Sequence, residues 1–221
     1  MNARLPLLAA AVISSFLVSS VRGATHTNLV ENFSNYNSVW GATGDASKLV
    51  NDVPTETALE DTDTPGWTGT GLVFRARSSL RLGNSSKVGM VFTPPISLHP
   101  NAKTPGCATL SFHAGRTTGT SYTTIAPIVT VVDGNGDDIA GVSPTSYNPG
   151  KLGKLIEVSS LDNLDSCSTN VEGVAIFQTF SGLPDSFRFK FVPSTKGDGR
   201  TEIDAVLVTQ EVFKPAVISV K

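Results

Sequence analysis

The segment 186–191 constrains the fold of this chain most, because it alternates phenylalanine with charged or polar residues without a break. Phe187, Phe189 and Phe191 fall on one side of an extended chain, and Arg188 and Lys190 fall on the other. Successive side chains of a β-strand point to opposite faces. The segment therefore predicts a strand with one buried and one solvated face.

Other short segments with strand character recur along the chain, separated by turns rich in Gly, Pro, Asn and Asp. In residues 108–114, apolar residues alternate with Thr109, Ser111 and His113. We assign these three to the face away from the core. The polar stretch 34–65 is too long for a structureless loop, so we expect a strand near 48–50 or a helical turn near 57–61. The expected strands are 29–33, 72–77, 79–82, 88–93, 108–114, 128–132, 154–159, 171–180, 186–192 and 202–212. This spacing is typical of an all-β, antiparallel jelly-roll β-sandwich, here as a single domain.

Residues 1–23 have the features of a signal peptide. Arg4 precedes an apolar run, and small residues around Gly23 suit cleavage at that point. A membrane anchor is the alternative, but the run is short and is interrupted by Pro6 and two serines. The predicted domain is then 24–221, in a protein that is secreted, periplasmic or on the cell surface.

Export also changes the net charge of the mature chain, which bears on its partners, and the oxidation state expected of its cysteines. Loss of Arg4 and Arg22 with the signal takes the net charge from −2 to −4, which disfavours nucleic acid and anionic membranes as partners. In an oxidising compartment Cys107 and Cys167 are expected to form a disulfide, worth roughly 4 kcal/mol in the chain-entropy model. Two buried free thiols are the alternative.

Motifs of catalysis are missing from the sequence. It contains no nucleophile elbow, zinc-protease helix, C-x-x-C pair or glycine-rich phosphate loop. The acidic segment 133–138 lacks the glycine and glutamate positions of an EF-hand, and its Asn-Gly and Asp-Gly steps favour a hairpin turn. We therefore assign no catalytic residue.

Two segments carry a resemblance to a known family. Residues 66–98 (GWTGTGLVFRARSSLRLGNSSKVGMVFTPPISL) and 200–209 (RTEIDAVLVT) resemble the galactose-binding-like, carbohydrate-binding-module-like jelly rolls of bacterial secreted and surface proteins. The resemblance implies that the first and last strands are neighbours. It also implies glycan binding or a spacer role.

Two carboxylates fall on apolar registers. Glu31 alternates with Leu29 and Phe33, and by the same parity Asp204 shares a face with Val206 and Val208. Buried carboxylates need hydrogen bonds, an ion pair or a cation. In the resembling family, residues at the places of Glu31 and Asp204 contribute to a structural calcium site, although Ala205 stands where a second acidic residue is common. Exposure at the strand ends, or pairing with Arg200 or Lys190, is the alternative.

Sugar binding needs aromatic faces beside polar groups. The ligand candidates are Trp40, Trp67 and Tyr147. A core position is the alternative for both tryptophans and is favoured for Trp67, which leaves Trp40 and Tyr147 as the better candidates. The function predicted is a secreted, non-catalytic module that binds extracellular carbohydrate polymer. The alternatives are a structural or adhesive surface protein with protein partners, or a small glycan hydrolase acting through paired carboxylates.

Overall fold

A computed structural model describes residues 23–36, 48–76, 79–84, 86–117, 127–149, 171–193 and 201–214, with backbone alone for 115–117, 143–149 and 171–175. Within these residues the structure is twelve strands and one short 3-10 helix, η1 (Ser34–Tyr36). The strands are β1 (Gly23–Glu31), β2 (Lys48–Ala58), β3 (Thr68–Arg75), β4 (Leu80–Leu82), β5 (Gly89–Phe92), β6 (Ile96–Ser97), β7 (Ala108–Thr117), β8 (Ile128–Val132), β9 (Ser143–Pro149), β10 (Val171–Ser181), β11 (Ser186–Val192) and β12 (Thr201–Phe213).

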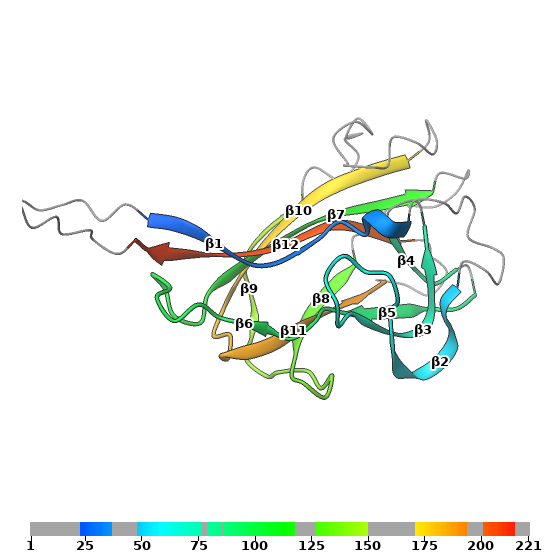
Figure 1. Ribbon diagram of the computed structural model, residues 1–221, viewed down its shortest axis with the longest axis horizontal. Helices are drawn as coiled ribbons and strands as arrows, with labels where there is room; N and C mark the ends of the chain where they lie inside the picture. Colours follow the sequence, from blue (N-terminus) through cyan, green and yellow to red (C-terminus); the bar gives the residue numbers. More distant parts are fainter. Residues whose placement is uncertain are drawn as a thin grey trace, which may run out of the picture.

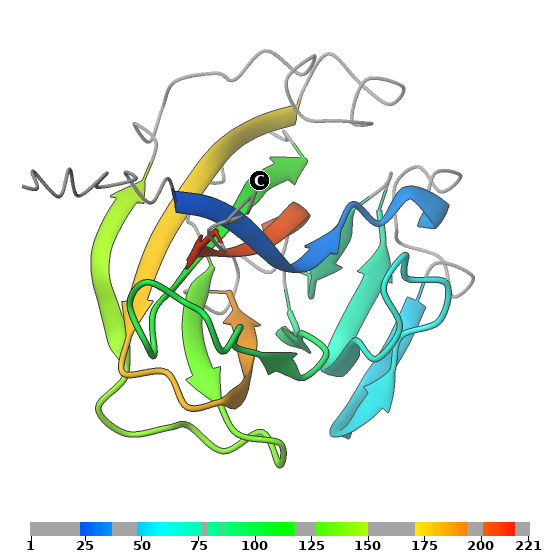
Figure 2. The same ribbon diagram turned by 60° about the vertical axis from the view of Figure 1, so that its left-hand side comes forward.

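The strands form two packed layers, and every pairing is antiparallel. One layer, called here the five-stranded layer, has the order β9–β10–β7–β12–β1 (Figures 1 and 2). The second layer contains β2, β3, β5, β11 and β8, with β6 beside β11. The short strand β4 pairs with both β3 and β12, so the layers are one sheet that turns at β4. The predicted antiparallel β-sandwich is confirmed, and its first and last strands pair.

The core lies between the layers, where phenylalanines from both layers meet. Phe187, Phe189 and Phe191 of β11 are buried as their alternation predicted. The ring of Phe112 from β7 meets Phe191 edge-on at 5.2 Å, and Phe180 from β10 lies 5.0 Å from Phe189. Burial of such aromatic rings is the main favourable contribution to a core of this kind.

Close backbone contacts explain two glycines in the segment 66–98. Gly71 of β3, with a φ of 69°, stands opposite Gly89 of β5. A Cβ at Gly71 would lie 2.2 Å from the Val88 carbonyl oxygen, and one at Gly89 would lie 2.1 Å from that of Leu72. Only glycine fits such an approach of two backbones.

The last strand contains a bulge that determines where several polar residues lie. Residues 201–203 of β12 pair with β4, and residues 206–213 pair with β1. Between them the register against β7 shifts, and Ala205 adopts a φ of 48°. The extra residue changes which side chains face the core. Ile203 and Val206 both belong to the core cluster.

The turn 133–138 joins the end of β8 to a short return, as the hairpin prediction required. Val132 bridges Asp138 in antiparallel fashion, and Asp133 accepts the backbone N–H groups of Asn135 and Asp137. The predicted signal peptide and the expected strand 154–159 fall outside the described residues, apart from Gly23, where β1 begins.

Candidate functional site

Threonines line up across the outer face of the five-stranded layer, the face away from the core. Thr109 of β7 stands opposite Thr179 of β10 on one side and Thr209 of β12 on the other. Thr209 in turn stands opposite Thr27 of β1. Directly opposed residues project from the same face, so the four side chains form one row, called here the threonine row.

A second row runs beside it, two residues away on β12, β7 and β10 and three residues away on β1, where the register against β12 shifts. It consists of Val30, Leu207, Ser111 and Phe177, again in direct register. Phe177 and Val30 are each 51% exposed, although both are large apolar side chains. We call these four residues the apolar row, because all but Ser111 are apolar. The outer face thus presents the hydroxyl groups of the threonine row next to exposed apolar surface.

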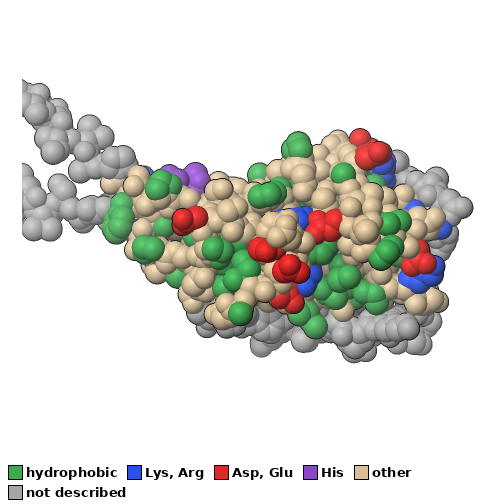
Figure 3. Space-filling model, turned by 90° about the horizontal axis from the view of Figure 1, so that it is seen from below, with side chains coloured by type: hydrophobic (Ala, Val, Ile, Leu, Met, Phe, Trp, Pro, Cys, Tyr) green, Lys and Arg blue, Asp and Glu red, His purple; other side chains and the backbone are tan. Residues whose placement is uncertain are grey.

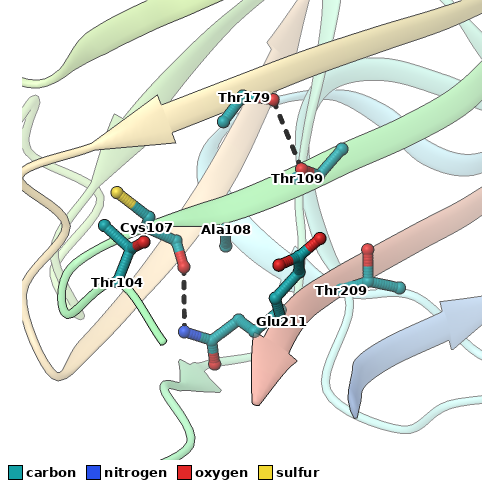
Figure 4. Close-up of a pocket in the computed structure, with 8 residues that line it drawn as sticks. Thr104, Cys107, Ala108, Thr109, Thr179, Thr209 and Glu211 are labelled. Atoms are coloured by element: carbon teal, nitrogen blue, oxygen red, sulfur yellow. Dashed lines mark hydrogen bonds between the residues drawn. The ribbon is translucent and has the colours of Figure 1, made fainter. Parts of the chain in front are cut away.

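A shallow hollow of about 240 Å³ opens at the threonine row (Figure 4). The hydroxyl groups of Thr109 and Thr179 share a hydrogen bond of 3.3 Å at its wall. Thr104 and Cys107 lie at its rim, beside the start of β7. The hollow is smaller than the roughly 300–1,000 Å³ of sites that enclose drug-sized ligands. Its size suits one small polar ring.

The charge at this hollow is balanced. Glu211 lines it, and its Oε2 lies 3.0 Å from Nζ of Lys103. Both side chains are partly exposed, so this pair contributes little stability. It does keep the rim close to neutral.

Charged residues at the other end of the same face are buried. Asp204 stands opposite His113, and Arg81 of β4 stands opposite Glu202. Arg81 lies 4.9 Å above the ring of Phe74. The two carboxylates are each only 2% exposed, whereas glycosidase carboxylates must contact the substrate. Glu202 and Asp204 are therefore too buried to contact a glycan substrate directly.

The outer face of the second layer holds an ion-pair network. Arg188 donates to Oε2 of Glu56 at 2.8 Å, to Oγ1 of Thr68 at 2.6 Å and to the Thr93 carbonyl at 2.8 Å. Lys190 pairs with Asp138 nearby. Figure 3, which views the molecule from this side, shows acidic and basic side chains next to one another. Because these charges satisfy each other, we interpret the network as structural.

Glu31 is buried, as its parity predicted, and its oxygens are occupied by the backbone. Oε1 accepts the N–H groups of Phe33 at 2.8 Å and Asp63 at 3.1 Å, and Oε2 accepts that of Thr64 at 2.8 Å. Burial raises the pKa of Glu31, while these three hydrogen bonds oppose the rise. The carboxylate ties the end of β1 to the loop before β3.

The expected parity of Asp204 is wrong, because the bulge at Ala205 intervenes. Asp204 pairs with His113, on the face opposite Phe112, while Glu31 pairs with the core residue Val206. The register therefore places Glu31 and Asp204 on opposite faces, which does not fit a shared cation. Among the described residues, no group of three or more His, Cys, Asp or Glu side chains could hold a metal ion. Calcium binding stays a prediction that a chelator-dependent melting temperature would test.

The structure gives a different result for each of the three aromatic residues predicted to bind a ligand. Trp67 is fully buried against Phe33, so it is a core residue and its ring cannot stack on a ligand. Trp40 lies outside the described residues, and Tyr147 holds a backbone position opposite Gln178 without a described side chain. Phe177 was missed because we considered only Trp and Tyr. Its alternation with the buried Ile176 and Gln178 would have placed it on the outer face.

The disulfide prediction also stays untested. Cys107 is half-buried just before β7, and Cys167 lies outside the described residues.

Comparisons with protein-family models, with curated proteins and with solved structures found no match. Within the described part of the chain, no helix is long and apolar enough to span a membrane.

Proposed function

We propose that this protein is a secreted, non-catalytic module that binds extracellular carbohydrate through the outer face of its five-stranded layer. The observation that carries the proposal is Phe177, an exposed aromatic ring two residues from Thr179 of the hollow, on the same face of β10. Sugar rings combine apolar C–H faces with polar hydroxyl edges. A site for them needs an exposed aromatic surface next to hydrogen-bonding groups.

The surrounding chemistry supports a neutral ligand. Glu211 at the hollow is paired with Lys103, and the apolar row carries no charge. A flat, partly open site of this kind suits a polymer on a surface better than a small metabolite, which would be enclosed.

Phe213 provides a matched control for a test of this proposal. It is the same residue type as Phe177 and is equally exposed at 51%. It lies near the end of β12, opposite Gly23 and beyond the last register pair of β12 with β7. We would screen the protein on a glycan array and measure the melting temperature with each sugar that binds. Ligand bound to the folded state should raise the melting temperature.

The expected result is binding to at least one glycan that Phe177→Ala weakens tenfold or more and Phe213→Ala leaves unchanged. Equal effects of the two variants would contradict the assignment of the face. An empty array, with binding to extracellular proteins that Phe177→Ala abolishes, would support an adhesive protein instead.

Secretion has its own test. Expression of residues 1–221 in a secreting host should yield a mature chain beginning at Ala24, read by N-terminal sequencing. Retention of residues 1–23 would contradict the signal peptide.

A further inference from the structure

The spacing of the threonine row defines which carbohydrate would fit it. Its four members come from four consecutive strands, β1, β12, β7 and β10. Neighbouring strands lie about 4.8 Å apart, so the row spans about 14 Å across the sheet. The spacing of about 4.8 Å between neighbouring strands is close to the length of one pyranose unit in an extended glycan chain.

The apolar row follows the same course. Val30, Leu207, Ser111 and Phe177 come from these same strands in the same order. A ligand lying along both rows would therefore meet threonine hydroxyls on one side at every strand, and on the other side apolar groups at β1, β12 and β10 and the Ser111 hydroxyl at β7. This arrangement repeats across the strands, in the direction in which a polymer would extend.

Linkage geometry selects among neutral glycans. In β-1,4-linked chains the bonds leave each ring equatorially, so the chain is extended and flat, with alternating hydroxyl edges and apolar ring faces. In α-1,4-linked glucans the axial bond coils the chain into a helix. Only the extended chain would keep successive sugars in step with successive strands.

We infer that the outer face binds one extended, neutral, β-linked polysaccharide chain that runs across the strands with about one sugar for each strand. This inference rests on the proposed function and adds the ligand class and direction. The hollow beside Thr109 and Thr179, at about 240 Å³, would accept one ring of that chain.

The first experiment measures affinity against chain length and linkage. We would titrate the protein with cello-oligosaccharides of increasing length and with malto-oligosaccharides as the α-linked comparison. Insoluble cellulose and starch would be tested in parallel. Affinity should rise with each added β-linked unit until about four sugars, the number of threonines in the row, and then level off. The α-linked series should bind at least tenfold more weakly.

The second experiment tests the two rows directly. Thr209→Val keeps the shape of the side chain and its fit to a strand while removing the hydroxyl. It should weaken cellohexaose binding severalfold, and Phe177→Ala should weaken it more. Phe213→Ala, four residues along β12 from the Thr209 of the threonine row, should leave it unchanged. Circular dichroism and the melting temperature of each variant would show that loss of binding is not loss of folding.

The outcomes separate this inference from the proposed function. If single sugars bind as tightly as long chains, or α-linked chains as tightly as β-linked ones, the extended-chain inference fails while carbohydrate binding stands. If no glycan binds, both fail. If the protein instead sediments as a dimer that Phe177→Ala dissociates, the face is an interface between copies of the chain, and both are again contradicted.

Discussion

At the scale of single residues, Arg188 shows how much one buried charge can connect. The side chain is 5% exposed, and it bonds groups from β2, β3 and the end of β5. It also lies 5.1 Å from the ring of Phe92. Its alternation with the phenylalanines predicted a side chain away from the core, which is correct. The same pattern also predicted contact with water, which is wrong because the carboxylate of Glu56 covers it.

We expect Arg188→Ala to lower the free energy of unfolding by about 2 kcal/mol or more, because it leaves the Thr93 carbonyl and Glu56 without their charged donor. Lys190→Ala is the matched control on the same face of β11. Its partner Asp138 is 65% exposed, so we expect a loss below about 1 kcal/mol. Urea denaturation measures both. Similar losses in the two variants would contradict a special role for Arg188.

Glu31 leads to a prediction about pH. Burial raises its pKa in the folded protein above the ordinary glutamate value of 4.5. A group whose pKa is raised by folding stabilises the fold below its unfolded pKa, and this contribution is lost as the pH rises through the folded pKa. Glu31→Gln cannot titrate. The stability of the wild type relative to Glu31→Gln should therefore fall as the pH rises above about 4.5.

Urea denaturation of both proteins between pH 3 and pH 7 measures this difference. Glu31→Gln should also be less stable overall, because its amide group turns a donor toward one of the three backbone N–H groups. A difference that grows with rising pH would mean that the hydrogen bonds outweigh burial and lower the pKa instead.

At the scale of elements, most strands follow from their patterns. The expected bounds of β8 and β11 match those in the structure. The strand β9 could not be predicted, because Pro144 and Pro149 argue against a strand. They are tolerated because β9 is the last strand on its side of the five-stranded layer. The bulge in β12 could not be predicted either. Nothing in the sequence distinguishes Ala205, which adopts a positive φ, from any other alanine.

The bulge in β12 can be tested at Ala205, whose φ is 48°. Valine has the higher strand propensity, but a β-branched residue is strained in this conformation. Ala205→Val should therefore destabilise the protein by about 1–2 kcal/mol. Leu207→Val, on the same strand just beyond the bulge, should cost less than about 1.5 kcal/mol because the change is small and the site is half-buried. A stabilising Ala205→Val would show that the left-handed conformation is not retained.

At the scale of the whole molecule, the sandwich and the pairing of β1 with β12 were within reach of the sequence. The candidate face was not, because it is assembled from strands far apart in the chain. Thr27 and Thr209 meet only because the first and last strands pair, and Thr109 and Thr179 meet only through the pairing of β7 with β10. Each threonine read alone is an ordinary strand residue. Their alignment is visible only once the register is known.

The distribution of charge over the molecule gives the last prediction. The chain carries a net charge of −2, and its candidate face combines hydroxyls, apolar groups and the paired Glu211. Exposed charges are strongly screened as the Debye length falls from about 30 Å at 0.01 M salt to about 3 Å at 1 M. Binding of a neutral glycan should therefore change less than about twofold over this range, measured by isothermal titration with the tightest ligand from the array. Polyelectrolyte ligands release counterions and lose affinity steeply with salt. A tenfold or greater loss would consequently indicate that the face recognises a charged polymer, with Lys103 released from Glu211 as the group to mutate next.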